Sequence, residues 1–192
     1  ENNCFITLTY KPERLPEGET LIKAHFQQFM KRLRKAISPK KIRYFHCGEY
    51  GEKSGRPHYH AIIFGLDFEI GPEYHQKQFH TENNGNRLYI SQFLTDTWGQ
   101  GFASIGAVTF DSAAYVARYC MKKVTGDKAD QHYKTLDYET GEIIDLLPEY
   151  TTCSRRPGIA YDWYMQFGEE IRENDNVTLN GQKMTFKPPK YY

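Results

Sequence analysis

The fold of this chain is decided by the stretch KIRYFHCGEYGEKSGRPHYHAIIF, residues 41–64. Residues 41–49 and 58–64 have the aromatic and β-branched character that predicts two strands. Between them, residues 51–57 read GEKSGRP, and glycine and proline are the residues that most favour a turn. We therefore expect an antiparallel hairpin whose two strands lie side by side.

The segments around this hairpin alternate between strand and helix patterns. The side chains of residues 5–10 alternate in character as those of a strand do. Residues 20–37 repeat apolar side chains at helical spacing, and Ser38-Pro39 ends this helix. Further helices are expected at 89–98, at 113–124 with Asp111 or Ser112 as its cap, and at 159–171. Further strands are expected at 101–110 and, at the edge of the sheet, at 146–153. A short hairpin is expected around Asn180-Gly181, and loops are expected at 65–85 and 126–142.

This order of elements indicates the fold class. It has too few helices, and strands too closely paired, for a doubly wound parallel sheet. We predict an α+β fold, in which helices cover an antiparallel sheet.

Composition indicates one globular domain, with or without an appendage. The chain has 192 residues, 39% of them hydrophobic, which is enough to bury a substantial core. No apolar run approaches the ~18 residues of a transmembrane helix, and no signal peptide is evident. The chain begins at Glu1 rather than Met, which predicts an excised domain of a longer protein. Its four cysteines lack C-x-x-C spacing, which favours buried, reduced thiols in a cytosolic protein.

The second strand of the hairpin begins with a His-x-His pair. His58 and His60 point to the same face, because side chains alternate along a strand, and two imidazoles on one face can bind one ion. If paired residue numbers sum to about 107, Glu49 lies opposite His58 and completes a metal site. A one-residue slip would turn Glu49 away and leave Glu52 as the alternative ligand. His46 has the opposite parity and is expected to be structural or to face DNA.

A doubled Tyr-x-x-basic motif occupies the helix that follows. At ~100° per residue, Tyr115, Arg118, Tyr119 and Lys122 fall within about a third of the helix circumference. A phenolate is a nucleophile, and a neighbouring cation lowers the pKa of a phenol. Two such tyrosines can also be ordinary surface aromatics, so the motif gains meaning from the metal motif that precedes it.

Basic residues are concentrated in one part of the chain. Seven lie between Lys31 and Arg43, with no acidic residue among them. This asymmetry fits a phosphate-facing surface, although a basic helix face can also be merely solvated. The candidate DNA-binding residues are Lys31, Arg32, Arg34, Lys35, Arg118 and Lys123.

Three ordered segments carry a family resemblance. FITLTY at 5–10, GEYG at 48–51 with RPHYH at 56–60, and YVARYCMK at 115–122 resemble the three motifs of HUH-type rolling-circle replication initiators. The paired tyrosines resemble the two-tyrosine class, and the whole pattern looks most like the initiators of microviruses, particularly the gokushovirus branch.

The resemblance implies a fold, an activity and a set of site residues. The fold would be a ferredoxin-like palm. We expect residues 1–172 to form the HUH endonuclease domain and residues 173–192 to be a C-terminal extension or a tail of the same domain. The activity would be a Mg²⁺- or Mn²⁺-dependent nick in single-stranded DNA with a 5′-phosphotyrosine intermediate. Glu49, His58 and His60 match the metal ligands, Tyr115 and Tyr119 the nucleophiles, and Lys122 would assist them.

Two other functions remain open from the sequence. One is a non-enzymatic module that binds single-stranded nucleic acid by stacking, and the other is a hydrolytic metallonuclease with water as nucleophile. For the initiator, the expected partners are single-stranded origin DNA, which could form a hairpin, and the host replication polymerase and helicase, in the cytoplasm of a bacterial host. No membrane partner is expected.

Overall fold

Strand β1 (Asn3–Tyr10) forms the centre of the fold, and its side chains alternate between half-buried and buried positions. In the computed structural model it pairs antiparallel with β3 (Pro57–Phe64) on one side and β6 (Gly101–Gly106) on the other. The structure describes residues 2–52, 54–68, 76–81, 87–137, 140–178 and 185–187, without the side chains of 76–79, 119–122, 177–178 and 185. Contacts divide the chain into two compact units, Glu1–Cys153 and Ser154–Tyr192.

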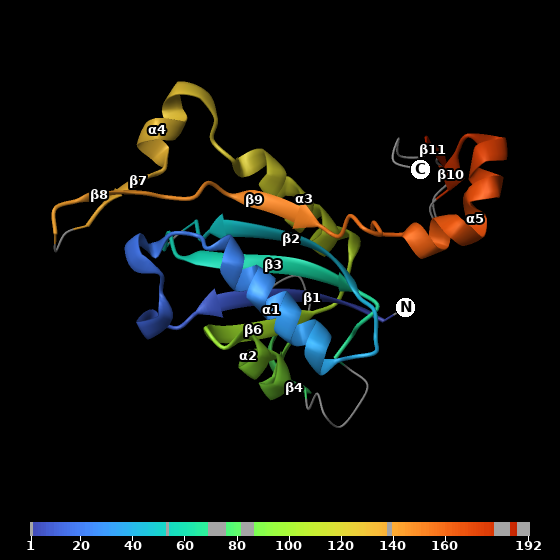
Figure 1. Cartoon of the computed structure of the whole chain (residues 1–192), viewed down its shortest axis with the longest axis horizontal. Helices are drawn as coiled ribbons and strands as arrows, with labels where there is room; N and C mark the ends of the chain where they lie inside the picture. The colour runs from blue at the N-terminus through green and yellow to red at the C-terminus, as the bar shows by residue number, and fades with distance from the viewer. Residues whose placement is uncertain are drawn as a thin grey trace. The chain divides into compact units, whose positions relative to one another are not determined.

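The other elements follow along the chain (Figure 1). The strands are β2 (Arg43–Tyr50), β4 (Gln76–Thr81), β5 (Arg87–Ser91), β7 (Lys134–Leu136), β8 (Ile143–Asp145), β9 (Tyr150–Cys153), β10 (Val177–Thr178) and β11 (Thr185–Phe186). The helices are α1 (Lys23–Ala36), α2 (Gln92–Trp98), α3 (Phe110–Lys122), α4 (Ala129–His132) and α5 (Tyr161–Asn174), with short 3-10 turns η1 (Pro12–Arg14), η2 (Glu17–Glu19) and η3 (Gly126–Lys128).

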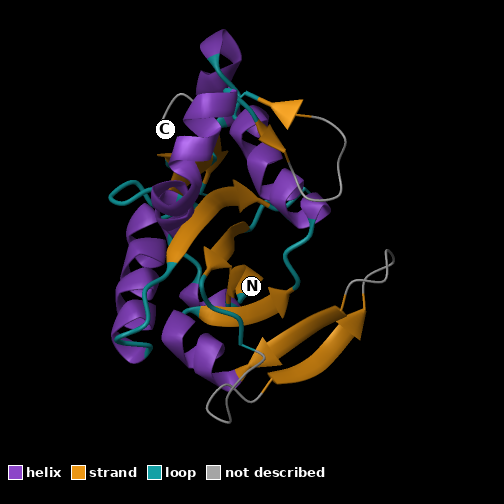
Figure 2. Ribbon diagram, turned by 90° about the vertical axis from the view of Figure 1, so that its right-hand side faces the viewer, coloured by secondary structure: helices purple, strands orange, loops and turns teal. Residues whose placement is uncertain are grey.

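Seven strands of the first unit form an antiparallel sheet in the order β4-β5-β6-β1-β3-β2-β9, and β7 and β8 of the same unit pair separately. Its centre, β6-β1-β3-β2, is connected as β1-α1-β2-β3-α2-β6, which is the βαββαβ arrangement of a ferredoxin-like fold. Strands β4 and β5 are inserted before α2 and extend the sheet beyond β6 (Figure 2). The predicted α+β class with a ferredoxin-like antiparallel sheet is therefore confirmed.

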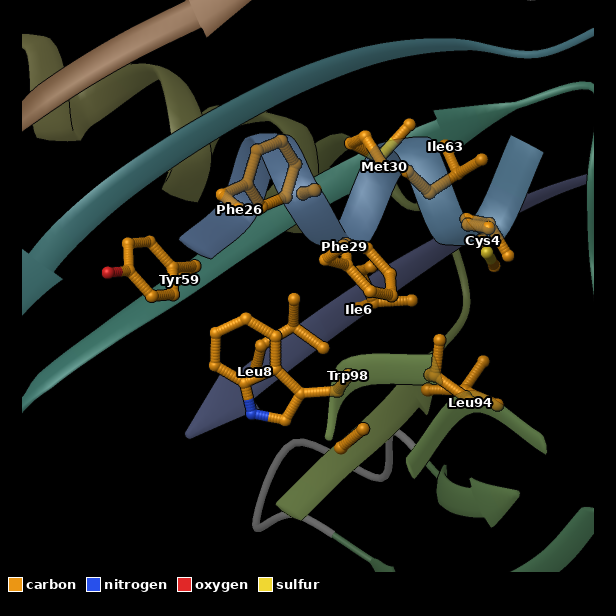
Figure 3. Close-up of a cluster of buried hydrophobic side chains, with 14 of the residues drawn as sticks. Cys4, Ile6, Leu8, Phe26, Phe29, Met30, Tyr59, Ile63, Leu94 and Trp98 are labelled. Atoms are coloured by element: carbon orange, nitrogen blue, oxygen red, sulfur yellow. The ribbon is translucent and has the colours of Figure 1, made fainter. Parts of the chain in front are cut away.

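Helices α1 and α2 cover one face of this sheet and enclose the main core (Figure 3). Phe26 and Phe29 of α1 and Trp98 of α2 are almost completely buried against the alternate side chains Ile6 and Leu8 of β1. The Trp98 indole Nε1 donates a hydrogen bond of 2.8 Å to the Thr9 carbonyl, so this large side chain is buried with its polar group satisfied.

Helix α3 packs on the opposite face, over β2, β3 and β9. Val116 is fully buried there against Cys47 and Ile62, and Phe5 and Ala113 pack around them. Because successive strand residues point to opposite faces, β1 to β3 supply the main core with one set of side chains and the α3 face with the other.

The structure corrects several expected boundaries. Tyr89 belongs to strand β5 and not to a helix, because it pairs with Ile105 of β6. Thr109 caps α3, in place of Asp111 or Ser112: its side chain accepts from the Ser112 amide, and the Ser112 hydroxyl accepts from the Thr109 amide. Strands β4 and β7 lie in segments expected to be loops, whereas β9 is an edge strand as predicted.

The second unit contains α5 and the short β10–β11 pair. The pair agrees with the expected hairpin, whose Asn180-Gly181 turn lies outside the described residues. The expected domain boundary after residue 172 stays a prediction. In the part of the chain that is described, no helix is long and apolar enough to cross a membrane.

Gly101 provides a test of the packing between β6 and β1. A Cβ at this position would lie 2.3 Å from the Thr9 carbonyl oxygen and 2.4 Å from the Lys11 nitrogen, which are backbone atoms that cannot move aside. We expect Gly101→Ala to lower the free energy of unfolding by about 2 kcal/mol or more in urea titrations. Gly106→Ala, in the same strand, meets only the Leu88 and Phe5 side chains and should cost less. Equal losses of stability in the two variants would contradict this interpretation.

Candidate functional site

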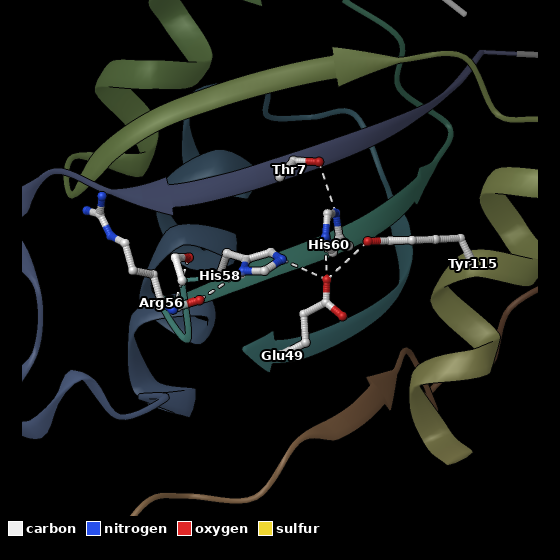
Figure 4. A network of polar contacts seen from close by, with 7 residues as sticks. Thr7, Glu49, Arg56, His58, His60 and Tyr115 are labelled. Atoms are coloured by element: carbon white, nitrogen blue, oxygen red, sulfur yellow. Dashed lines mark hydrogen bonds and ion pairs between the residues drawn. The ribbon is translucent and has the colours of Figure 1, made fainter. Parts of the chain in front are cut away.

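The hairpin strands β2 and β3 bring two histidines and a glutamate together. Glu49 pairs with His58, as the expected register requires, and Cys47 pairs with His60. The Glu49 Oε1 atom lies 2.7 Å from His58 Nε2 and 2.9 Å from His60 Nε2 (Figure 4). One ligand atom from each residue lies within 4.8 Å of the others, so the cluster could hold a metal ion.

Backbone and side-chain contacts orient both imidazoles. His58 Nδ1 lies 3.1 Å from the Arg56 carbonyl oxygen. A carbonyl oxygen can only accept, so Nδ1 donates this hydrogen bond. Within the cluster Nε2 donates to the Glu49 carboxylate, and its lone pair would become available if a metal ion took the place of that proton. His60 Nδ1 lies 2.9 Å from the Thr7 hydroxyl, and Phe5 stacks on the ring at 5.4 Å. Such contacts to the outer nitrogen are typical of metal-binding histidines.

The Glu49 carboxylate is buried, with only 2% of its surface exposed. Burial by itself raises the pKa of this carboxyl, but the hydrogen bonds and charge of His58 and His60 outweigh burial and place its pKa below the usual value. Its Oε2 atom is buried and has no hydrogen-bond partner among the described residues. A buried carboxylate oxygen without a donor fits a metal ion, which would satisfy it.

Tyr115 reaches the cluster from α3. Its hydroxyl donates a hydrogen bond of 3.2 Å to Glu49 Oε1, and its ring packs edge-on against His60 at 5.1 Å. The side chain is 40% exposed, so the phenol lies between the cluster and solvent. Val116, buried on the adjacent side of α3, fixes the helix on the sheet and so positions Tyr115.

Of the predicted tyrosine motif, the described side chains place Tyr115 at the cluster. Tyr119 and Lys122 lie in α3, but their side chains are outside the described residues. Arg118 is exposed on the same helix, and Lys123 is exposed where the helix ends.

The basic residues of α1 lie on the other side of the sheet from the cluster. Lys31 and Lys35 are exposed there. Arg32 donates hydrogen bonds of 2.8 Å to the carbonyls of Thr97 and Trp98 and thereby ties α1 to the end of α2. Arg34 lies over the Tyr44 ring at 5.6 Å.

Sequence patterns did not identify the residues that support the cluster. Thr7 and Phe5 contact His60 only because β1 pairs with β3. The sequence did contain a signal, because Phe5 and Thr7 are alternate residues of one strand and so lie on the same face, but the register of β1 against β3 was unknown. His46 is structural: it is buried in the main core and stacks on Phe26 at 3.5 Å.

Comparisons with known proteins agree on one group. Residues 3–124 match the family described as replication-associated protein ORF2. Over 200 aligned residues the chain is 33% identical to the replication-associated protein VP4 of Bdellovibrio phage phiMH2K, covering all of this chain and 57% of the relative. It is 32% identical to replication-associated protein ORF2 of Spiroplasma virus 4 (57% of it covered) and 29% to ORF4 of Chlamydia phage 1 (45% covered).

The chain thus spans about half the length of these curated relatives, while each alignment covers all of this chain. No solved structure matches it.

Thr7 provides a test of the cluster as a metal site. Thr7→Val keeps the side-chain shape but removes the hydroxyl that lies against His60 Nδ1. We expect Mn²⁺ binding, measured by calorimetry, to weaken by about 10- to 100-fold. Thr9→Val is the matched control, because the Thr9 hydroxyl contacts the Phe102 carbonyl and no histidine. Equal Mn²⁺ affinities in the two variants would show that Thr7 does not support a ligand.

Proposed function

Because this chain belongs to the family of replication-associated protein ORF2, we propose that it is a replication-initiator endonuclease of the HUH type. It would nick single-stranded DNA at an origin by tyrosine attack, assisted by Mg²⁺ or Mn²⁺. The observation that carries the proposal is the hydrogen bond of 3.2 Å from the Tyr115 hydroxyl to Glu49, the residue that both histidines also contact. Nucleophile and candidate ligands therefore share one site.

Glu49, His58 and His60 would hold the divalent ion. Bound there, the ion supplies a Lewis acid for a phosphate oxygen and offsets the charge that develops in the transition state. Arg56 and Thr7 keep the imidazoles in place through their contacts with the outer ring nitrogens. Because these contacts exist before DNA binds, little reorganisation is needed when the phosphate arrives.

Tyr115 is the nucleophile in this proposal. Its phenol oxygen attacks the phosphorus, a new O–P bond forms, and the bond from phosphorus to the 3′ oxygen breaks. The phenol proton passes to solvent, which the partial exposure of Tyr115 allows, and the departing 3′ oxygen takes up a proton to become a hydroxyl. The DNA 5′-phosphate stays on the tyrosine, so the strand can be rejoined without a further energy source.

The remaining candidate residues have supporting roles in the proposal. Tyr119 lies one helical turn beyond Tyr115 and would serve as the second nucleophile when strands are rejoined. Lys122 would favour the phenolate, and Arg118 and Lys123 would contact phosphates on either side of the scissile bond.

The proposed product defines the partners. A free 3′-hydroxyl is a primer for a host replication polymerase, and unwinding of the displaced strand calls for a host helicase. Two of the relatives are phage proteins, so we propose that the chain acts in the cytoplasm of a bacterial host, on single-stranded origin DNA that could form a hairpin.

Replacement of the tyrosines tests the nucleophile. Tyr115→Phe removes one oxygen and should reduce the covalent protein–DNA adduct, seen on denaturing gels with Mn²⁺, by about 100-fold or more. Tyr119→Phe should retain the first cleavage but impair strand transfer. Single-strand binding should persist in both variants, because only hydroxyls are removed.

Other outcomes of this experiment identify the alternatives. Hydrolysed ends without an adduct in the wild type would indicate a metallonuclease that uses water. Binding without any cleavage would indicate a non-enzymatic module. Mass spectrometry that places the adduct on a residue other than Tyr115 or Tyr119 would refute the assignment.

Charge removal tests where DNA lies. Arg118→Ala/Lys123→Ala should weaken binding of single strands. The slope of log affinity against log salt concentration should fall by about 0.7 for each phosphate that is no longer neutralised. Replacing Lys31, Arg34 and Lys35 with Ala on α1 should weaken binding less for each charge removed, because α1 covers the face away from the cluster. An unchanged salt slope in the α1 variant would confine the DNA to the α3 side.

A further inference from the structure

A single row of residues crosses four strands through the cluster. Glu49 pairs with His58, His58 pairs with Thr9, and Thr9 pairs with Phe102. Directly paired residues in an antiparallel ladder point to the same face of the sheet. Phe102 of β6 therefore stands on the face that carries the cluster.

Phe102 is unusually exposed for an aromatic residue within a strand of the central sheet. Its side chain is 61% exposed, whereas Tyr59 of β3 is fully buried on the other face. Helix α3 packs over β2, β3 and β9. In Figure 4, β1, which carries Thr7, and β6 next to it lie on the side of the two histidines that is away from Glu49. The sheet thus presents Phe102 to solvent beside the cluster.

The neighbours of Phe102 are polar. Thr9 and Thr7 of β1 and Ser104 of β6 are half-buried on the same face, and the Thr9 hydroxyl donates to the Phe102 carbonyl at 3.4 Å. One aromatic ring among hydroxyl groups is too small an apolar surface for a stable protein interface. It suits a nucleobase, which offers an apolar face for stacking and polar edges for hydroxyls.

Distance and charge favour a nucleotide close to the cleaved bond. Phe102 lies two strands from His58, about 10 Å at the usual interstrand spacing. Arg56 lies at the same end of the sheet, where its guanidinium donates a hydrogen bond of 3.0 Å to the carbonyl of Tyr10, the partner of Gly101. That hydrogen bond uses one of five N–H donors, so a phosphate can be bound by others.

We propose that Phe102 stacks a base of the nucleotide next to the scissile phosphate and so positions single-stranded DNA across β1 and β6. This inference rests on the proposed function, because it takes DNA as the ligand of the cluster. The occupant is the base itself: stacking tolerates any base, so Phe102 would contribute affinity and position and not sequence choice.

The test compares DNA with and without bases. Binding of a 15-nucleotide oligothymidylate and of an abasic strand of the same length is measured with the full chain in the absence of added metal. Phe102→Ala should weaken oligothymidylate binding by roughly 5- to 150-fold, the usual effect of removing one stacked base, and leave abasic binding unchanged. The salt slope should not change, because every cation that can bind a phosphate is still present.

Two control variants sharpen the result. Phe102→Trp keeps an aromatic face and should retain oligothymidylate affinity. Ile143→Ala removes a side chain that is 68% exposed in the separate β7–β8 pair and should change neither affinity. An unchanged oligothymidylate affinity in Phe102→Ala, or an equal loss for both strands, would overturn the inference. Because no cleavage is required, this result is independent of whether Tyr115 forms an adduct.

Discussion

The antiparallel register of β2 and β3 is the constraint on which the rest of the site depends. Side chains alternate along a strand, so Glu49, His58 and His60 share a face only when Glu49 pairs with His58. A slip of one residue would turn Glu49 towards α1 and destroy the cluster. The register is secured from the other face, where Tyr59 and His46 of the same strands are buried in the main core.

That core fixes polar groups as well as apolar ones. The Tyr59 hydroxyl lies 2.7 Å from the Tyr10 hydroxyl and also bonds to the amide and carbonyl of Ile22, just before α1 begins. Because buried hydroxyls are costly when unpaired, this network favours one placement of α1 on the sheet. The two faces of the sheet thus have different roles. The face covered by α1 and α2 stabilises the fold, and the opposite face carries the cluster and Tyr115.

The match to the replication-associated family covers the same part of the molecule. Residues 3–124 extend from β1 to the end of α3 and so contain every residue of the cluster and the whole tyrosine helix. The preorganised contacts are also confined to this part, since Thr7, Arg56 and Tyr115 all lie within it. Ligand orientation and nucleophile placement therefore depend on one continuous piece of sheet and helix.

The sequence by itself determined the hairpin, the common face of His58 and His60 and the helix that carries Tyr115. These features depend on short periodic patterns, and such patterns are local. The sequence left Glu49 and Glu52 as alternative ligands, and the observed register, in which Glu49 pairs with His58, decided between them. Only the tertiary structure decided that Thr7 supports His60, that Phe102 shares the face of the cluster and that Arg32 is bound to α2.

The same distinction explains the boundaries that the sequence misplaced. Tyr89 has an acceptable helical pattern but becomes a strand residue because β6 offers it a partner. In the same way, only the packing of α1 against the main core placed its cations away from the cluster. Each of these outcomes depends on contacts between residues far apart in the chain, and no local pattern encodes which distant strand or helix will be the neighbour.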